Sequence, residues 1–390
     1  KTDRALRHLG IAQYLEEVVG AREHRPAWLV DQLAHHLGSA TTLATEIGPV
    51  GGLPGFPSDL PVRARRWIVE AAERARRDRA LPTAVRLYGE ALDLLPDDDA
   101  GSEEAAALHL ARAQVAAETW DLATARADLD RACDYADATG DLVAAAQALV
   151  VRGGIEQKEG DLEAAAATLT AAVERFEELG DRAGTADALR NRAMVEIFGG
   201  QIPEAEASAS AALAGFREVG DAAGEAWSLQ NLGWTAFVSG RSEHAEERVR
   251  EAIERFDEIG DTRGLAWSRG LLAWVRFQEG RVAEAEELGE RVLEEARSRV
   301  DPWATPMMVM LQASLRLWRG RTEEAVELAR DALARFESLA DGYGEVQAAA
   351  VLGRALVMAG RVEEGFAVLE RVARATASRP RSAALAAYTR

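Results

Sequence analysis

Small and apolar residues recur along most of this chain at a fixed interval. Every fortieth position is small in one register of the pattern, at Gly153, Ala193, Gly233, Ala273, Ala313 and Gly353. Small or short side chains follow twelve positions later, as at Ala165, and after a further seven, as at Ala172. Charged pairs such as Glu246–Glu247 lie between the apolar positions. Because small side chains let helix axes approach closely, the pattern predicts two packed amphipathic helices in each unit.

Glycine marks the ends of these predicted helices at two places in each unit. One set comprises Gly160, Gly200, Gly240, Gly280, Gly320 and Gly360. The other comprises Gly140, Gly180, Gly220 and Gly260, and each of these is followed by aspartate. Glycine can adopt the left-handed conformation that ends a helix, and aspartate can cap the next one. A fixed period of this length predicts a solenoid, whose extended surface suits binding better than catalysis.

Phenylalanine follows the same period, at Phe176, Phe216, Phe256 and Phe336. A large apolar side chain at one place in the repeat is typical of a buried position. We expect these four rings to fill the seam between successive units.

The chain divides into three segments by pattern. Residues 63–377 form the repeat array, with about eight units, and residues 378–390 form a C-terminal tail. Residues 1–62 lack the period but contain two amphipathic helical segments and the Gly/Pro-rich connector PVGGLPGFPSDLP. Because an unpaired first repeat would expose its apolar side, we expect residues 1–62 to be an N-terminal helical cap or linker.

Composition supports an all-α fold and narrows the classes of partner. Hydrophobic residues make up 48% of the chain, and long alternations of β-branched residues are missing. A net charge of −19 argues against direct binding of nucleic acid, whose phosphates would be repelled. The sequence contains no apolar run of transmembrane length and no signal peptide, so we expect a cytoplasmic protein without membrane contact. Lysine occurs only at Lys1 and Lys158, which indicates a GC-rich, actinobacterial source. A start at Lys1 rather than methionine predicts part of a longer protein.

No catalytic or metal-binding motif stands out. Cys133 is the single cysteine, so neither a disulfide framework nor a thiolate zinc site is predicted. The chain has no Gly-Lys phosphate loop and no Gly-x-Ser-x-Gly elbow. His35 and His36 are adjacent, and adjacent helical side chains point about 100° apart, which disfavours chelation. The other histidines are scattered along the sequence with no supporting cluster: His8, His24, His109 and His244. We therefore predict no enzyme activity, no cofactor and no metal site.

The spacings of twelve and then seven positions between small residues resemble those of the tetratricopeptide repeat. The resemblance covers about residues 65–375 and includes two earlier units, marked by Ala72, Ala84 and Ala91 and by Ala113, Ala125 and Ala132. The units here are longer than the family repeat of about 34 residues, so their helices are expected to be longer. The resemblance implies a right-handed superhelical solenoid in which the first helix of each unit lines a concave groove.

Carrying the groove positions of that family onto this chain selects a set of aromatic, methionine and polar residues. They are Arg190, Asn191, Met194, Trp227, Gln230, Asn231, Trp234, Phe237, Trp267, Trp274, Phe277, Met307, Met310 and Trp318. One interpretation is a groove that binds a protein, a peptide or a small apolar ligand, with a polar edge that fixes orientation. The other is that these rings pack between units and contribute to folding. Both interpretations remain open at this point.

A second resemblance concerns residues 1–98. The segments LRHLGIAQYLEEVVG and PVRARRWIVEAAERA look like the stretch that joins the ATPase module to the repeats in actinobacterial signal-transduction ATPases. Maltose-type transcriptional activators and cyclases of that architecture are examples. The resemblance implies a ligand-sensing module of a larger regulator, whose partner could be its own ATPase module. The alternative is a free-standing scaffold or an adaptor that associates with itself as a homo-oligomer.

Overall fold

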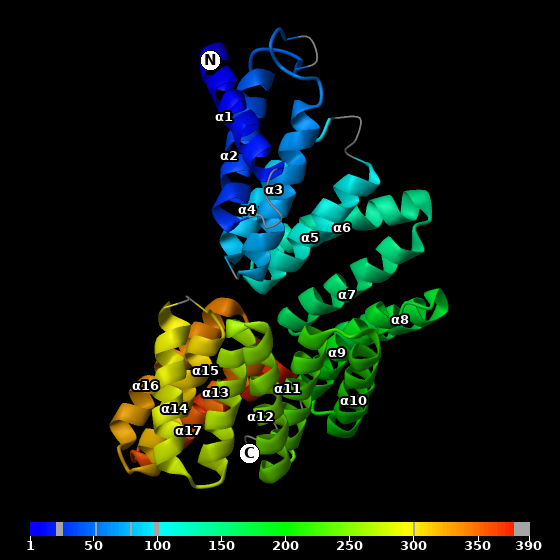
Figure 1. Ribbon diagram of the computed structural model, residues 1–390. Helices are drawn as coiled ribbons and strands as arrows, with labels where there is room; N and C mark the ends of the chain where they lie inside the picture. Colours follow the sequence, from blue (N-terminus) through cyan, green and yellow to red (C-terminus); the bar gives the residue numbers. More distant parts are fainter. Residues whose placement is uncertain (21–25, 51–52, 79, 97–100, 299–300, 378–390) are drawn as a thin grey trace. The chain divides into compact units, whose positions relative to one another are not determined.

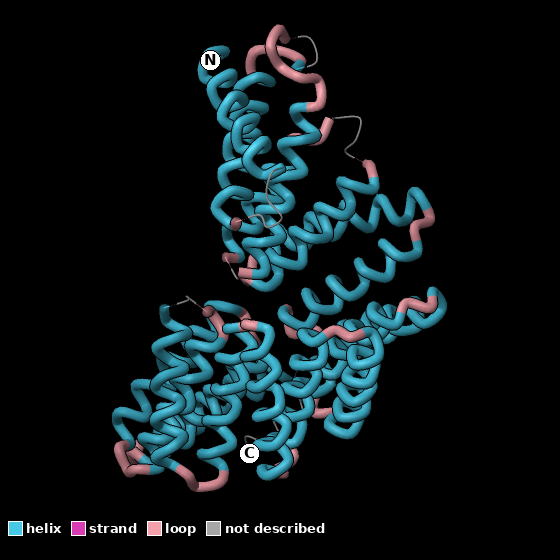
Figure 2. Tube along the Cα trace, viewed as in Figure 1, coloured by secondary structure: helices cyan, strands magenta, loops and turns pink. Residues whose placement is uncertain are grey.

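A computed structural model describes residues 1–390 except 21–25, 51–52, 79, 97–100, 299–300 and 378–390 (Figure 1). Within the described residues the chain forms eighteen α-helices and no strand (Figure 2). The predicted all-α fold is confirmed, and sixteen repeat helices follow two preceding ones. The predicted tail, 378–390, lies outside the described residues. None of the described helices combines the length and the apolar character needed to cross a lipid bilayer.

The chain consists of two compact units, Lys1–Val151 and Arg152–Arg390. The first unit contains α1 (Thr2–Gly20), α2 (Ala27–Thr45), α3 (Leu60–Arg77), α4 (Leu81–Asp93), α5 (Glu103–Glu118) and α6 (Leu122–Thr139). Helix α7 (Leu142–Lys158) includes the point of division. The second unit continues with α8 (Leu162–Leu179), α9 (Arg182–Phe198), α10 (Ile202–Val219), α11 (Ala222–Val238), α12 (Ser242–Ile259), α13 (Thr262–Gln278), α14 (Val282–Ser298), α15 (Ala304–Trp318), α16 (Thr322–Leu339), α17 (Gly342–Met358) and α18 (Val362–Ala377).

The Gly-Asp pairs end one helix and begin the next, as the sequence predicts. Gly220 ends α10 with a φ of +75°, a conformation that glycine adopts without steric cost. The side chain of Asp221 then accepts hydrogen bonds from the backbone N–H groups of Ala223 and Gly224 at the start of α11. Ala340 takes the same left-handed conformation after α16, with a φ of +54°, although it is not glycine.

The seam between repeats is built from a phenylalanine and a glycine of the following helix. A Cβ added to Gly224 would lie 2.2 Å from Cδ1 of Phe216, and the same overlap occurs at three other seams. The four phenylalanines are buried, so their predicted position in the seam is confirmed. At the seam between those of Phe256 and Phe336, the ring is replaced by Ala296 and the glycine by Ala304. The two positions therefore vary together: a large ring requires glycine opposite it, and a small residue does not.

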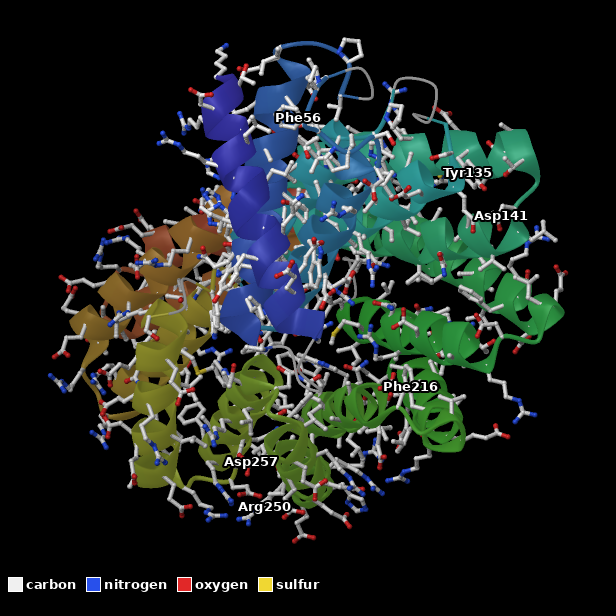
Figure 3. The ribbon with its side chains drawn as sticks, turned by 45° about the horizontal axis from the view of Figure 1, so that its top comes forward. Phe56, Tyr135, Asp141, Phe216, Arg250 and Asp257 are labelled. Atoms are coloured by element: carbon white, nitrogen blue, oxygen red, sulfur yellow. The ribbon has the colours of Figure 1, made fainter. Side chains whose placement is uncertain are left out.

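The second helix of each pair turns a charged face outward. On α12, Arg250 and Asp257 are exposed and project from the ribbon, whereas Phe256 on the same helix is fully buried (Figure 3). This is the amphipathic pattern that the sequence predicts for these helices.

In the first unit, one hydrophobic core includes residues from α1 and α2 together with residues of α3 and α4. Leu33 of α2 and Ile68 of α3 are both buried in it. The indole of Trp67 on α3 also donates a hydrogen bond of 3.3 Å to Glu16 on α1. Residues 1–62 therefore pack on the first repeat helices, although the boundary at 62–63 and the role as a cap stay predictions.

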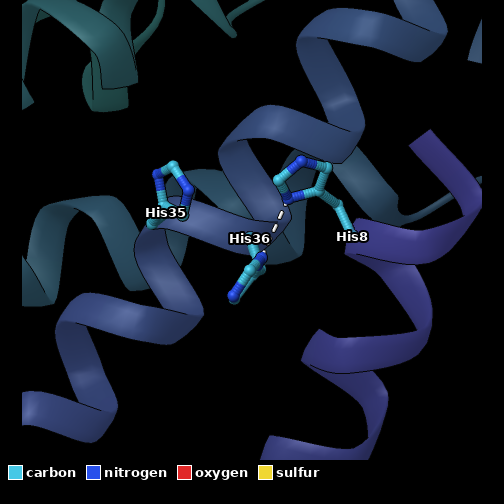
Figure 4. A group of neighbouring side chains, drawn as sticks. All are labelled: His8, His35 and His36. Atoms are coloured by element: carbon cyan, nitrogen blue, oxygen red, sulfur yellow. Dashed lines mark hydrogen bonds between the residues drawn. The ribbon is translucent and has the colours of Figure 1, made fainter. Parts of the chain in front are cut away.

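The expectation that His8 is isolated from the other histidines is wrong. Helix α1 brings His8 beside His35 and His36 of α2, and Nδ1 of His8 lies 2.8 Å from Nδ1 of His36 (Figure 4). His109 is not isolated either, because its Nδ1 lies 2.8 Å from Oδ1 of Asp128. Sequence spacing cannot reveal either contact, since each joins side chains from two helices.

Candidate partner-binding face of the second unit

The first helices of successive repeats bring tryptophans to one face of the second unit. Trp227 on α11 and Trp267 on α13 occupy equivalent positions, and their ring centroids lie 6.1 Å apart at an interplanar angle of 74°. The guanidinium of Arg263 lies over both rings, 5.7 Å from the centroid of Trp227 and 5.2 Å from that of Trp267. Both indoles are half-buried. Each side chain is therefore partly exposed to solvent.

A third tryptophan, Trp303, extends this row from the turn before α15. Its ring stacks on Trp267 with a centroid distance of 4.6 Å and an interplanar angle of 17°. It also lies 6.3 Å from the ring of Trp234. Sequence reasoning did not include Trp303, because the groove positions were taken from within the helices. The available signal was that Trp303 stands at the place in its repeat that Arg263 occupies in the preceding one.

A second row of rings lies at the other end of the same helices. Trp234 is only 6% exposed and meets Phe237, whose centroid is 6.2 Å away. Trp274 is half-buried and has the same relation to Phe277, also at 6.2 Å. Phe277 in turn meets Trp318, which is 69% exposed. This row therefore passes from the buried interior at α11 to solvent at α15.

The space among these tryptophans is small. The cavity bounded by Trp234, Trp274, Trp303 and Met307 has a volume of about 20 Å³ and an almost wholly apolar lining. Such a volume accommodates roughly one water molecule, and an apolar lining offers that water no hydrogen bonds. Met307 and Met310 are 5% and 4% exposed. In this conformation these residues pack with each other, and a ligand has no room among them.

The polar residues of the predicted edge bond to the protein itself. The Asn231 amide donates a hydrogen bond of 3.0 Å to the carbonyl of Arg190 on α9. The Asn191 amide donates to the carbonyl of Asp187, and the Arg190 guanidinium pairs with the Asp187 carboxylate at 2.7 Å. Gln230 is 1% exposed, and both polar atoms of its side chain lack a hydrogen-bond partner among the described residues. Asn231 thus ties α11 to α9, whereas the buried amide of Gln230 retains unused hydrogen-bonding capacity.

Tyr343 contacts a helix of the second unit that is distant from it in the sequence. Its ring, at the start of α17, stacks on Phe198 of α9 with a centroid distance of 4.4 Å and an interplanar angle of 24°. Burial, together with the nearby carboxylate of Asp341, raises the pKa of the Tyr343 hydroxyl well above its usual value. Met194 on α9 is half-buried. Because Phe198 and Tyr343 are far apart in the sequence, no local pattern could predict that they meet.

Residues 183, 223, 263, 303 and 343 explain much of this arrangement, since all stand two positions after the capping aspartate. The five residues are alanine, alanine, arginine, tryptophan and tyrosine in chain order. The three large ones lie over rings that the first helices supply. In the three later repeats, the side chain from the turn therefore covers part of the ring surface that the first helices supply.

Comparison with known proteins identifies the repeats. A family model described as Tetratricopeptide repeat matches residues 144–218 and 184–258. No curated protein matches the sequence.

Solved structures share the fold at low sequence identity. The structure of a Rap protein complexed with Competence and Sporulation Factor is 17% identical, with a TM-score of 0.55 over 93% of this chain and 95% of that one. A signal transduction ATPase with a tetratricopeptide repeat sensor, from Pyrococcus horikoshii, is 15% identical, with a TM-score of 0.51 over 87% of this chain and 52% of that one. These similarities extend the repeat fold beyond the segment that the family model matches.

Proposed function

Residues 144–258 of this chain are tetratricopeptide repeats, and on this premise we propose that the protein is a non-catalytic module that binds a protein or peptide partner. The binding surface is the tryptophan face formed by Trp227, Trp267 and the exposed edge at Trp318. The observation that carries the proposal is the pair of half-buried indoles at equivalent positions in adjacent repeats. Aromatic rings of this kind give a large contact area at a small cost in conformational entropy.

The chemistry of this face favours an extended partner over a small ligand. The cavity of about 20 Å³ is far smaller than the roughly 300–1,000 Å³ of ligand sites. The partly exposed indoles of Trp227 and Trp267 instead lie in adjacent repeats. A peptide or helix with apolar side chains could therefore contact Trp227 and Trp267 together. The small apolar ligand expected as an alternative is less well supported.

We further propose that the module belongs to a larger cytoplasmic regulator, as a sensor whose partner includes the regulator's own ATPase module. The similarity in fold to the repeat sensor of a signal transduction ATPase supports this role. So does the resemblance of residues 1–98 to the stretch that follows such ATPase modules. The coding sequence upstream of Lys1 tests this part, because a phosphate-loop ATPase there is required. Its absence would contradict the sensor role.

A self-associating scaffold is the second candidate, and one observation favours it. Helices α17 and α18 carry exposed apolar side chains, including Met358 and Phe366, which are 58% and 59% exposed. An exposed apolar surface of this kind can pair with a second copy of the chain. Sedimentation of the full chain over a range of concentrations distinguishes the two candidates. Only the scaffold requires a dimer, and Phe366→Ser should then abolish dimer formation.

A displayed peptide library tests the binding surface. We expect the wild-type chain to enrich peptides with aromatic or aliphatic residues, and Trp227→Ala and Trp267→Ala each to weaken the selected peptides by at least about fivefold. Trp28→Ala is the matched control, since Trp28 is 54% exposed but lies in the first unit. If both indole variants bound the selected peptides as tightly as wild type does, with melting temperatures near that of wild type, the result would contradict the proposed surface.

A further inference from the structure

The histidine cluster of the first unit lies far along the sequence from the tryptophan face and plays no part in the proposed function. His8 extends from α1, and His35 and His36 extend from α2 (Figure 4). One nitrogen atom from each ring lies within 4.8 Å of a nitrogen from each of the others. Three imidazoles thus converge at one point of the seam between α1 and α2.

The spacing of the three rings matches that of three ligands around one metal ion. Their centroids lie 5.7 Å apart for His8 and His35, and 5.0 Å apart for each of the other two pairs. Zinc binds imidazole nitrogen at about 2.0–2.1 Å, so tetrahedral geometry places ligand ring centroids about 5.2 Å apart. The rings are also tilted, with interplanar angles between 45° and 74°, and none of the pairs is stacked. The ligand nitrogens, which lie within 4.8 Å of one another, would have to come to about 3.3 Å apart for tetrahedral coordination at these bond lengths.

The contact between His8 and His36 already brings two possible ligand atoms close together. Their Nδ1 atoms are 2.8 Å apart, so one must donate a proton and the other must accept it. A metal ion could accept the lone pairs of both Nδ1 atoms once the donor ring carries its proton on Nε2 instead. His35 and His36 are adjacent, which disfavours chelation by these two residues alone, but their ring centroids lie only 5.0 Å apart and α1 supplies a third imidazole beside both.

A metal ion binds the neutral form of imidazole. The guanidinium of Arg4, which lies near His8, opposes an incoming cation, but Arg4 is exposed and solvent screens its charge.

We propose that His8, His35 and His36 form a binding site for a divalent transition-metal ion of the zinc class, which joins α1 to α2. Three neutral imidazole ligands suit Zn²⁺, Cu²⁺, Ni²⁺ and Co²⁺ and disfavour Mg²⁺ and Ca²⁺, which prefer oxygen. His35 is exposed, so water can complete the coordination. Because α1 and α2 share a core with α3 and α4, the ion would stabilise the whole N-terminal part of the first unit.

Titration of the full chain, free of any histidine tag, tests the site with Zn²⁺ alone. Calorimetry should show one Zn²⁺ bound per chain, with binding lost as the pH falls and the imidazoles become protonated. Loss of a single partner in the outer shell of a metal site typically costs about 10- to 100-fold in affinity. Removal of a direct ligand in His8→Gln or His36→Gln should therefore weaken binding at least about tenfold. His244→Gln is the matched control, because His244 is exposed and lies in the second unit.

The role of the ion in joining the helices has its own readout. Zn²⁺ should raise the melting temperature of wild type and of His244→Gln but not that of His8→Gln. Absence of saturable Zn²⁺ binding by wild type would overturn the proposal, as would unchanged affinity in His8→Gln. If His8→Gln does not fold, the visible absorption spectrum of wild type with bound Co²⁺ tests the site instead. Intense absorption indicates tetrahedral coordination by nitrogen ligands. Weak absorption, typical of octahedral Co²⁺, would overturn the proposal.

Discussion

The indole of Trp303 donates a hydrogen bond of 2.7 Å from Nε1 to Oδ2 of Asp341. The other oxygen of this carboxylate accepts a hydrogen bond from the backbone N–H of Tyr343 at the start of α17. Asp341 is only 7% exposed. One buried carboxylate therefore caps a helix and also orients the ring that stacks on Trp267.

This relationship predicts an unusual dependence of stability on pH. Burial raises the pKa of Asp341 above its usual value of 3.8, although hydrogen bonds from Trp303 and the backbone oppose the rise. The folded state then binds a proton more readily than the unfolded state does. The stabilisation from Asp341 is consequently complete below pH 3.8 and is lost as the pH rises through the raised pKa.

Urea unfolding of wild type and Asp341→Asn at a series of pH values measures this effect. We expect the free energy of unfolding of wild type, minus that of the variant, to fall as the pH increases through this range. Asp221→Asn is the control, because Asp221 caps a helix at the equivalent position of its repeat but is exposed. It shows the effect of replacing a capping carboxylate without the effect of burial. If this difference in the free energy of unfolding increased with pH, the result would contradict a raised pKa for Asp341.

The seam between repeats predicts a rescue. Gly224→Ala places a methyl group against the ring of Phe216 and should destabilise the protein by about 1–3 kcal/mol. Phe216→Ala should cost about 3–5 kcal/mol. In the double variant the added methyl group meets no ring, as in the natural pair Ala296 and Ala304, so the total cost should be smaller than the sum.

Chemical denaturation of the four proteins gives this coupling free energy. Gly154→Ala is the control, since its new Cβ meets nothing within 4 Å and replaces glycine inside a helix. That change should stabilise by about 0.5–1 kcal/mol. Strictly additive effects at Gly224 and Phe216 would show that the ring and the glycine do not restrict each other.

Ala340 offers a stabilising substitution. Its φ of +54° is unfavourable for alanine, and glycine occupies the equivalent positions at Gly220 and Gly260. We expect Ala340→Gly to raise the free energy of unfolding by about 1 kcal/mol, measured by urea denaturation. The reverse change, Gly260→Ala, should lower it by about 1–2 kcal/mol, because only backbone strain changes there. Destabilisation by Ala340→Gly would mean that its methyl group contributes more than the strain costs.

The two rows of tryptophan differ in what they contribute to folding. Trp234 is 6% exposed, so Trp234→Ala should cost about 3–5 kcal/mol. Trp318 is 69% exposed, and Trp318→Ala should change stability by less than about 0.5 kcal/mol. Thermal and urea unfolding measure both. Equal effects would show that burial does not separate packing residues from accessible ones on this face.

The N-terminal helices should be needed for the stability of the first repeats. Leu33 is fully buried in the core that α2 shares with α3, so Leu33→Ala should cost about 2–5 kcal/mol. Deletion of residues 1–59 should lower the melting temperature further and cause association through the exposed side of α3. An unchanged melting temperature after deletion would mean that residues 1–62 are a detachable linker and not a cap.

Periodicity alone determined the architecture. Small residues spaced by forty, twelve and seven positions and the Gly-Asp turns depend on helix geometry and local capping, and both are properties of neighbouring residues. The all-α fold, the helix pairs and the buried phenylalanines could therefore be predicted without coordinates. The pairing of Phe216 with Gly224 was also present in the sequence, but its meaning depends on the contact distance that the fold creates.

Tertiary structure decided what the candidate residues do. A helical position specifies a direction for the side chain but not what lies opposite it. For this reason the sequence placed Trp234, Met307 and Met310 beside Trp227 in one groove, whereas packing buries the first three and leaves Trp227 half-buried. The stacking of Tyr343 on Phe198 and the convergence of His8 with His36 follow from how helices distant in the sequence come together. Contacts of this kind depend on the accumulated geometry of the packed helices, which no local pattern encodes.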